Sequence, residues 1–232
     1  MLVLALDTAT PASTAALVEV TADGLYGIVE QRTVDPRAHG EKLAPEIAAA
    51  LAEAGVRPRD LGAIVAGLGP GPFTGLRVGL ATAASMGQAL GIPTYGVCSL
   101  DALGRAAGPG RVLVATDARR REVYYATYLD GERVAGPEVA RPADVVASLA
   151  GDDGAATTLA GLVDKAAGEG ALKYGDVFGV PVEEHLLHPP GAALVALAAA
   201  RIREGAPSEA LTPLYLRRPD AVEPAGRKPV LT

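Results

Sequence analysis

The densest group of residues with chemical potential is a glycine- and proline-rich segment from Gly67 to Gly79. It separates an apolar run of strand length from a stretch with helical character. Such a turn exposes backbone N–H groups at a helix N-terminus, where the helix dipole favours an anion. The glycines lack the Gly-x-Gly-x-x-Gly spacing of dinucleotide-binding loops, and no Gly-Lys-Ser/Thr follows as in a P-loop. The segment therefore predicts a structural turn in preference to a phosphate-binding loop.

Two aspartates end similar apolar runs, Asp7 after residues 2–6 and Asp117 after residues 111–116. If these runs are equivalent strands, the two carboxylates face each other across a cleft, as metal–phosphate aspartates do in two-lobed ATP-using proteins. Neither turn contains the glycines that let a phosphate approach closely. Two alternatives stay open: Asp7, Thr8 and Asp117 are vestigial nucleotide-binding residues, or the aspartates hydrogen-bond their own backbone in ordinary turns.

Metal-ligating and catalytic patterns are scarce. The chain has three histidines, His39, His185 and His188, and no His-x-x-x-His spacing. No Ser/His/Asp arrangement or paired-carboxylate pattern stands out. The sequence therefore predicts no metal site and no catalytic residue.

The elements that must position these residues follow from hydrophobic periodicity. Apolar runs around an Asp23-Gly24 turn predict three strands within residues 2–32. Further elements are expected in the order helix (residues 40–54), strand (61–68), helix (74–90, with Thr74 as N-cap), strand (92–97) and a helix capped by Ser99.

The same order begins again after residue 110. A strand runs to Asp117, Asp130-Gly131 predicts a hairpin, Pro142 opens a helix, residues 157–163 form an apolar segment, and a last helix spans residues 191–204. The repeated order strand–strand–strand–helix–strand–helix predicts an α/β protein with two mixed-sheet lobes and a cleft between them. We expect lobes at residues 1–100 and 101–216, followed by a Pro-rich tail at 217–232.

A stripe of small residues marks the helix after the glycine-rich turn. Each internal glycine costs about 0.8–1 kcal/mol relative to alanine, so the stripe indicates close approach of another backbone. That backbone belongs either to the chain's own sheet or to a partner's helix. The preceding helix offers a similar face of small residues in Ala44, Ala48 and Ala52. The predicted partner interface comprises Leu43, Ile47, Leu51, Thr74, Gly75, Gly79, Ala83 and Gly87.

The amino-acid composition and charge exclude some classes of protein. The chain has 21 Lys+Arg against 27 Asp+Glu, a net charge of −6, which argues against a broad basic surface for nucleic acid. Basic residues cluster only at Arg119–Arg121 and near Arg217. The single cysteine, Cys98, lies in an apolar run and suits a buried hydrophobe in a reducing compartment. No run of about 18 apolar residues is present, so we expect a soluble cytoplasmic protein with no membrane partner.

Five segments resemble, in order and spacing, the bacterial TsaB (YeaZ) family. The most specific is Phe73-Thr-Gly-Leu-Arg77 within the glycine-rich turn. The five are residues 4–10, 39–45, 69–79, 117–124 and 213–217. The resemblance implies an actin-like (sugar kinase/Hsp70-type) two-lobed fold with duplicated RNase H-like βββαβα units.

The resemblance also implies a function. The family supplies the non-catalytic scaffold subunit of the complex that transfers threonylcarbamoyl to N6 of adenosine 37 in tRNAs reading ANN codons. The expected partners are the catalytic paralogue TsaD and the ATPase TsaE, with tRNA bound only indirectly. We expect a homodimer in the absence of TsaD, formed through the helices that otherwise bind TsaD.

The sequence departs from that of active relatives at positions that would bind a metal ion or a nucleotide. His39 aligns with the first histidine of the TsaD metal site, but Leu43 stands where the second is needed. Ala9 and Arg119 replace phosphate-loop glycines, so no cofactor is expected to bind autonomously, and ATP or ADP only at the level of the complex. Two alternatives are a metal- or ATP-dependent enzyme of the glycoprotease and actin-like superfamily, and an RNA-binding module.

Overall fold

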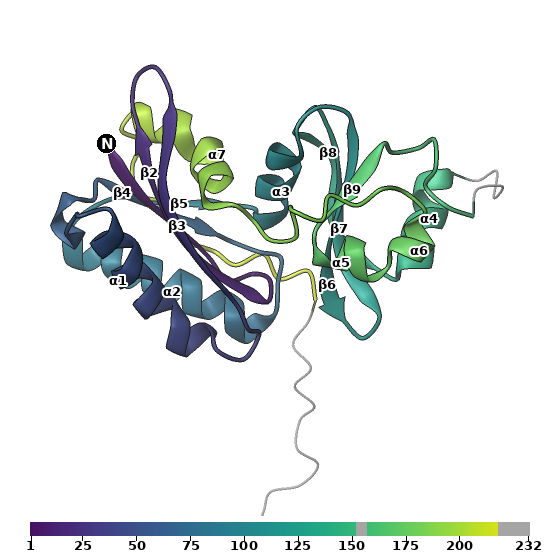
Figure 1. The fold of residues 1–232 in the computed structure, drawn as a ribbon, viewed down its shortest axis with the longest axis horizontal. Helices are drawn as coiled ribbons and strands as arrows, with labels where there is room; N and C mark the ends of the chain where they lie inside the picture. Colours follow the sequence, from purple (N-terminus) through teal and green to yellow (C-terminus); the bar gives the residue numbers. More distant parts are fainter. Residues whose placement is uncertain (152–156, 218–232) are drawn as a thin grey trace, which may run out of the picture.

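Two mixed β-sheets, one in each lobe, organise the chain (Figure 1). The computed structural model describes residues 1–151 and 157–217. Its elements are β1 (Leu2–Asp7), β2 (Ala12–Val20), β3 (Leu25–Val34), α1 (His39–Glu53), η1 (Pro58–Asp60), β4 (Ala63–Gly67), α2 (Phe73–Leu90), β5 (Thr94–Val97), α3 (Ser99–Ala107), β6 (Arg111–Arg119), β7 (Glu122–Leu129), β8 (Glu132–Ala140), α4 (Pro142–Ala150), β9 (Lys165–Ala167), α5 (Glu169–Lys173), α6 (Gly175–Phe178) and α7 (Gly191–Arg203).

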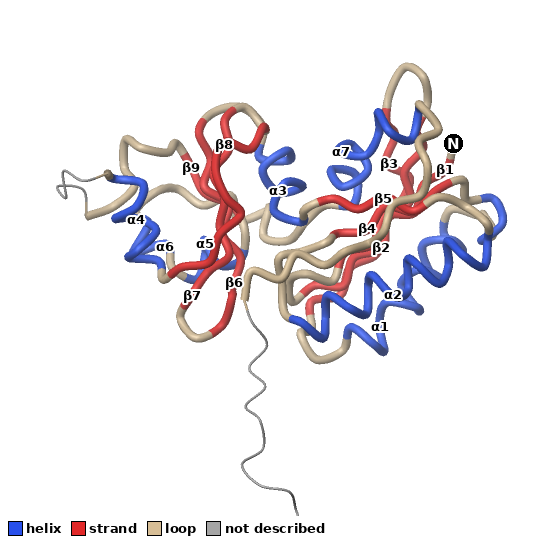
Figure 2. The backbone as a smooth tube through the Cα atoms, turned by 180° about the vertical axis from the view of Figure 1, so that it is seen from behind, coloured by secondary structure: helices blue, strands red, loops and turns tan. Residues whose placement is uncertain are grey.

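The N-terminal lobe is a sheet in the order β3-β2-β1-β4-β5 with helices on both faces. The first three strands pair antiparallel, and β1, β4 and β5 pair in parallel. Because successive side chains of a strand point to opposite faces, Leu4 and Leu6 pack toward α1 and α2, whereas Val3 and Ala5 pack toward α7. Figures 1 and 2 show α1 and α2 side by side on one face and α7 on the other.

The C-terminal lobe repeats this plan with a smaller sheet in the order β8-β7-β6-β9. Val112 and Val114 pack in one cluster with residues of α3. Leu113 and Ala115 pack in the other with residues of α4, α5 and α6. The order β–β–β–α–β–α therefore occurs twice, and the predicted actin-like fold is confirmed.

One part of the predicted lobe division is wrong. Helix α7 packs on β1, β2 and β4 of the N-terminal sheet, and Glu209 and Leu214 of the segment that follows bond to the backbone of Thr94 and Leu68. Residues 191–216 therefore belong mainly to the first lobe, although the sequence division assigned them to the second. The Pro-rich tail at 218–232 lies outside the described residues.

Some of the predictions for single turns, strands and helix caps are confirmed and others are wrong. Asp130 and Gly131 both have positive φ, 52° and 83°, which confirms the predicted hairpin turn. The strand expected at residues 157–163 is wrong, because β9 begins at Lys165. Thr74 and Ser99 are not N-caps, since Pro72 and Cys98 hold those positions. Within the part of the chain that the structure describes, no helix combines the length and apolar character needed to cross a membrane.

Candidate functional site

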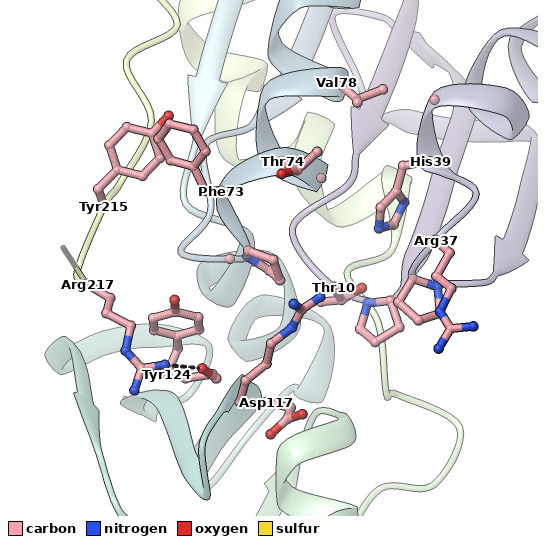
Figure 3. A pocket seen from close by; sticks show the side chains of 18 of the residues that line it. Thr10, Arg37, His39, Phe73, Thr74, Val78, Asp117, Tyr124, Tyr215 and Arg217 are labelled. Carbon is pink, nitrogen blue, oxygen red and sulfur yellow. Dashed lines mark hydrogen bonds between the residues drawn. The ribbon is translucent and has the colours of Figure 1, made fainter. Parts of the chain in front are cut away.

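A cavity of about 660 Å³ lies between the lobes. The start of α1, the first turn of α2, the β6–β7 turn and the C-terminal segment all line it, as Figure 3 shows from close by. The glycine-rich turn thus reaches the cavity with residues 71–75. Asp117 lines the cavity, whereas Asp7 and Thr8 do not.

Asp7 is buried behind the glycine-rich turn and is satisfied by its own chain. Ser99 Oγ donates a 2.5 Å hydrogen bond to Asp7 Oδ2, and the backbone N–H of Ala9 donates to Oδ1 at 3.0 Å. Burial raises the pKa of Asp7 to about 6, although these bonds act in the opposite direction. A β-carbon at Gly67 would overlap this carboxylate, so only glycine leaves room for it. Asp7 is therefore a structural carboxylate in this chain.

Thr8 joins the end of β1 to α2. Its hydroxyl donates to the carbonyl of Gly75 at 2.8 Å and accepts from the N–H of Gly79 at 3.1 Å. A β-carbon at Gly79 would overlap Thr8 Oγ1, and one at Gly75 would lie 2.9 Å from the ring of His39. Gly75 and Gly79 of α2 therefore leave room for the side chains of His39 and Thr8, which belong to the same chain.

Asp117 is neutralised by a cation from the same lobe. Lys173 Nζ lies 3.1 Å from both carboxylate oxygens of Asp117. Behind it, Glu169 Oε1 accepts from the Asp117 N–H at 3.0 Å, while Glu169 Oε2 is buried and has no partner within residues 1–151 and 157–217. Burial raises the pKa of Glu169 to about 7, and the charges of Asp117 and Asp7 add to the shift. A divalent metal ion would need the Asp117 carboxylate as a ligand, and the Lys173 ammonium group is already paired with that carboxylate.

The histidines of this region make hydroxyl contacts instead of a metal site. His39 Nδ1 lies 2.9 Å from Ser13 Oγ, and His188 Nδ1 lies 3.1 Å from Thr10 Oγ1. Burial lowers the pKa of His39 and brings that of His188 to about 4, so both rings are neutral near pH 7. The described residues contain no group of three His, Cys, Asp or Glu side chains placed to hold a metal ion.

Cationic side chains from both lobes line the cavity. Arg37 comes from the loop before α1 and Arg119 from the end of β6. Neither guanidinium has an ion pair within the described part of the chain. Arg119 has a φ of 61°, a conformation that glycine adopts more readily, so the turn keeps a glycine-like backbone while adding a charged side chain. The cavity can attract an anion. Among the described residues that line it, the Asp117 carboxylate is already paired with Lys173, so no two unpaired carboxylates are placed there for a metal–phosphate complex.

Sequence reasoning missed the C-terminal segment as part of the site. The ring of Tyr215 stacks on Phe73 with centroids 5.1 Å apart (Figure 3). Arg77 Nε donates a 2.9 Å hydrogen bond to the Tyr215 hydroxyl. Two residues later, Arg217 donates to the carbonyl of Ala118 and pairs with Glu122 in the other lobe. The segment thus holds both lobes at the mouth of the cavity, and only its resemblance motif marked it in the sequence.

The predicted partner interface requires a correction. Leu43, Ile47, Leu51, Gly75, Gly79, Ala83 and Gly87 are all buried within the chain, and only Thr74 is exposed. At Gly87, for example, a β-carbon would lie 2.5 Å from Thr94 Cγ2 of the neighbouring strand. The stripe therefore allows α2 to pack closely on its own lobe, and the prediction that it leaves room for a partner's backbone is wrong.

The opposite sides of the same two helices form an exposed surface of small side chains. We call this surface the outer helix face and define it by Ala44, Ala48 and Ala52 of α1 and Ala81 and Ala84 of α2. The two helices contact each other and cover one face of the sheet (Figure 2). A surface of small residues permits close approach of another protein's helices.

The comparisons with known proteins agree with this fold. The family model described as "TsaD: tRNA N6-adenosine threonylcarbamoyltransferase" matches residues 25–221. The solved structure "YeaZ from Pseudomonas aeruginosa" is 30% identical, with a TM-score of 0.72, and covers 93% of this chain and 99% of that one.

Among curated proteins, the uncharacterized protein Rv3421c of Mycobacterium tuberculosis is 51% identical over 219 residues, which are 94% of this chain and 93% of that protein. The Escherichia coli "tRNA threonylcarbamoyladenosine biosynthesis protein TsaB" is 36% identical over 132 residues, 55% of each chain. The chain spans 56% of the length of a related Mycobacterium leprae protein.

Proposed function

Because this chain belongs to the TsaB (YeaZ) family, we propose that it serves the synthesis of threonylcarbamoyladenosine in tRNA as a non-catalytic subunit. In this role it supports a TsaD-type catalytic paralogue that transfers threonylcarbamoyl to N6 of adenosine 37 in tRNAs reading ANN codons. TsaE joins the pair, and tRNA contacts this chain only indirectly.

The state of the two aspartates is the observation that carries the non-catalytic role. An enzyme that used this cleft for ATP would need carboxylates free to hold a metal ion beside the phosphates. Here Asp7 is buried and accepts a hydrogen bond from Ser99, and Asp117 is paired with Lys173. ATP or ADP then binds only at the level of the complex, with groups that the partner supplies.

The outer helix face is the proposed contact with the paralogue. The five alanines that define it are exposed, and both helices that carry them pack against the sheet. A paralogue with the same fold offers a similar pair of helices, so like surfaces can meet in a pseudo-symmetric pair. The proposed contact therefore lies on the exposed side of α1 and α2 and no longer on the buried small-residue stripe of α2. The same two helices still carry it.

Reconstitution tests the proposal. Purified TsaD, TsaE, threonylcarbamoyl-adenylate and an ANN-decoding tRNA should modify the tRNA over many turnovers only when this chain is added. Ala48→Arg on the outer helix face should weaken binding to TsaD and reduce modification at least tenfold. Ala147→Arg, at an exposed position of α4 in the other lobe, is the matched control and should change neither. Full multiple-turnover activity without this chain would contradict the proposal.

An activity assay separates the non-catalytic role from the enzyme alternative. The pure chain, supplied with Mg²⁺, Zn²⁺ or Fe²⁺, should hydrolyse ATP no faster than a blank. A turnover of about 1 per second, lost in Asp7→Asn with the fold intact, would show an enzyme instead.

A further inference from the structure

The last described residues of the chain form part of the wall of the inter-lobe cavity. Tyr215 and Arg217 both line it, and Arg217 is held there by its bond to the Ala118 carbonyl and its pairing with Glu122. In Figure 3, Arg217 lies at one side of the cavity and Arg37 at the other. The tail, residues 218–232, therefore starts at the rim of the cavity.

The cavity carries two positive charges that the described part of the chain leaves unpaired. Arg37 belongs to the wall formed by the N-terminal lobe and Arg119 to the wall formed by the C-terminal lobe, and neither has an ion pair among the described residues. The carboxylates on the wall are those of Glu41, which is exposed, and Asp117, which is paired with Lys173. A ligand with two negative charges spaced to reach both arginines is therefore attracted to the cavity.

The first part of the tail has the complementary chemistry. Residues 219–224, Pro-Asp-Ala-Val-Glu-Pro, place two carboxylates three positions apart with apolar side chains between and around them. The cavity wall likewise combines its arginines with apolar groups, among them Pro72, Phe73 and Val78. The basic residues of the tail lie outside this segment, at Arg218, Arg227 and Lys228. The segment therefore offers the two negative charges and the apolar contacts that the cavity can use.

We propose that residues 219–224 bind in the inter-lobe cavity of their own chain, with Asp220 paired to Arg119 and Glu223 paired to Arg37. Arg119 directly follows Ala118, to which Arg217 is bonded, so the first pair needs only a short reach. Asp220 is three residues beyond Arg217 and can reach about 10 Å from it, and Glu223, six residues beyond, about 20 Å. These lengths suffice for a cavity of about 660 Å³.

The tether at Arg217 makes even weak contacts effective. A segment attached at the rim of a site has an effective concentration there in the millimolar range. Each pair joins a guanidinium to a carboxylate, a combination that forms strong charge-assisted hydrogen bonds. The bound segment would therefore cover the cavity of the isolated chain and exclude other anions from it.

This contact goes beyond the proposed function and does not depend on it. It uses the cavity between the lobes, whereas the proposed paralogue contact uses the outer helix face. A cavity that the chain fills itself would give a physical reason for nucleotide to bind only at the level of the complex.

A tryptophan in the segment tests the proposal, because the chain contains no tryptophan of its own. In Val222→Trp the emission should lie at a shorter wavelength than that of an exposed tryptophan. Acrylamide should quench it about half as strongly or less, since a pocket buries most of the surface of what it binds. About 1 M NaCl, which reduces the Debye length to about 3 Å, should shift the emission toward that of an exposed tryptophan.

Removing the two cavity charges should release the segment. Arg37→Ala/Arg119→Gly in the Val222→Trp background should give the emission and quenching of an exposed tryptophan. The melting temperature should not fall, because glycine readily adopts the φ of 61° found at residue 119. Arg59→Ala/Arg141→Ala is the matched control, since it removes two exposed arginines that do not line the cavity, and it should leave the signal unchanged.

Exchanging one pair of charges tests the pairing itself. Asp220→Arg alone and Arg119→Glu alone should each release the segment, and their combination should restore the buried signal. Release that the combination does not reverse would overturn the pairing of Asp220 with Arg119.

Two results would overturn the proposal as a whole. An exposed tryptophan in Val222→Trp, with or without uptake of inorganic phosphate by the cavity in calorimetry, would show that the segment is not the occupant. A buried tryptophan that resists Arg37→Ala/Arg119→Gly would show that the segment binds elsewhere. The reconstitution assay judges the proposed function independently of either result.

Discussion

Ser99 Oγ donates a 2.5 Å hydrogen bond to Asp7 Oδ2, from 92 residues further along the chain. The same Ser99 oxygen accepts from the N–H of Gly69 at 3.2 Å, and the Ser99 N–H donates to the Gly69 carbonyl at 2.8 Å. The end of β1, the glycine-rich turn and the start of α3 are thereby joined at one buried point. The buried Asp7 carboxylate therefore serves to hold these three segments together.

Ser99→Ala should therefore destabilise the fold. It removes the only side-chain donor to a buried carboxylate within the described residues, and an unsatisfied buried group costs about 1–3 kcal/mol, more for a charge. Urea unfolding at pH 7 measures the loss. Ser85→Ala, at an exposed position of α2, is the control and should change the free energy of unfolding by less than about 0.5 kcal/mol. Equal effects for both serines would contradict the role given to Ser99.

Asp7→Asn should reduce the pH dependence of stability. The pKa of Asp7 is raised from 3.8 to about 6 in the folded protein, so the folded state binds this proton more tightly than the unfolded state. The resulting stability is fully present below pH 3.8 and is lost as the pH rises through about 6. The shift corresponds to about 3 kcal/mol. Urea unfolding between pH 4 and 8 should show this decline in the unmodified protein and a smaller one in Asp7→Asn, and equal declines would contradict the assignment.

Gly79→Leu should destabilise the monomer itself. Its side chain would collide with Thr8, and overpacking of this kind costs about 1–3 kcal/mol. Ala84→Leu, on the exposed side of the same helix, adds a side chain of the same size into solvent and should leave thermal unfolding nearly unchanged. If Gly79→Leu instead leaves the melting temperature unchanged, the packing of α2 on Thr8 is wrong.

Arg217→Ala should loosen the C-terminal segment at the cavity mouth. The change removes its bond to the Ala118 carbonyl and its pairing with Glu122. Amide hydrogen exchange should speed up in residues 214–217 and in the β6–β7 turn, while the strands of both sheets keep their protection. Arg59→Ala, at an exposed position in η1, should leave all these amides unchanged.

Much of the fold could be predicted because periodicity and turn residues are local properties. The repeated order, the Asp130-Gly131 turn and the start of α4 at Pro142 depend on residues close in sequence. The stripe of α2 could not be assigned in this way, because Thr8 and Thr94, which fill it, are distant in sequence. The same reason hid the pairing of Asp117 with Lys173, since nothing in either residue's neighbourhood indicates the other.

The position of α7 constrains how the protein is made. Its buried residues, such as Leu194 and Ala198, complete the core around Val3 and Ala5, yet they are translated after the whole of the second lobe. During synthesis one apolar face of the first sheet stays uncovered until residues 191–203 leave the ribosome. The second lobe's sheet and helices α3 to α6 are continuous in sequence, so all the buried residues of its two clusters are translated before α7. Synthesis from the N-terminus therefore favours a folding order in which the lobe that begins first finishes last.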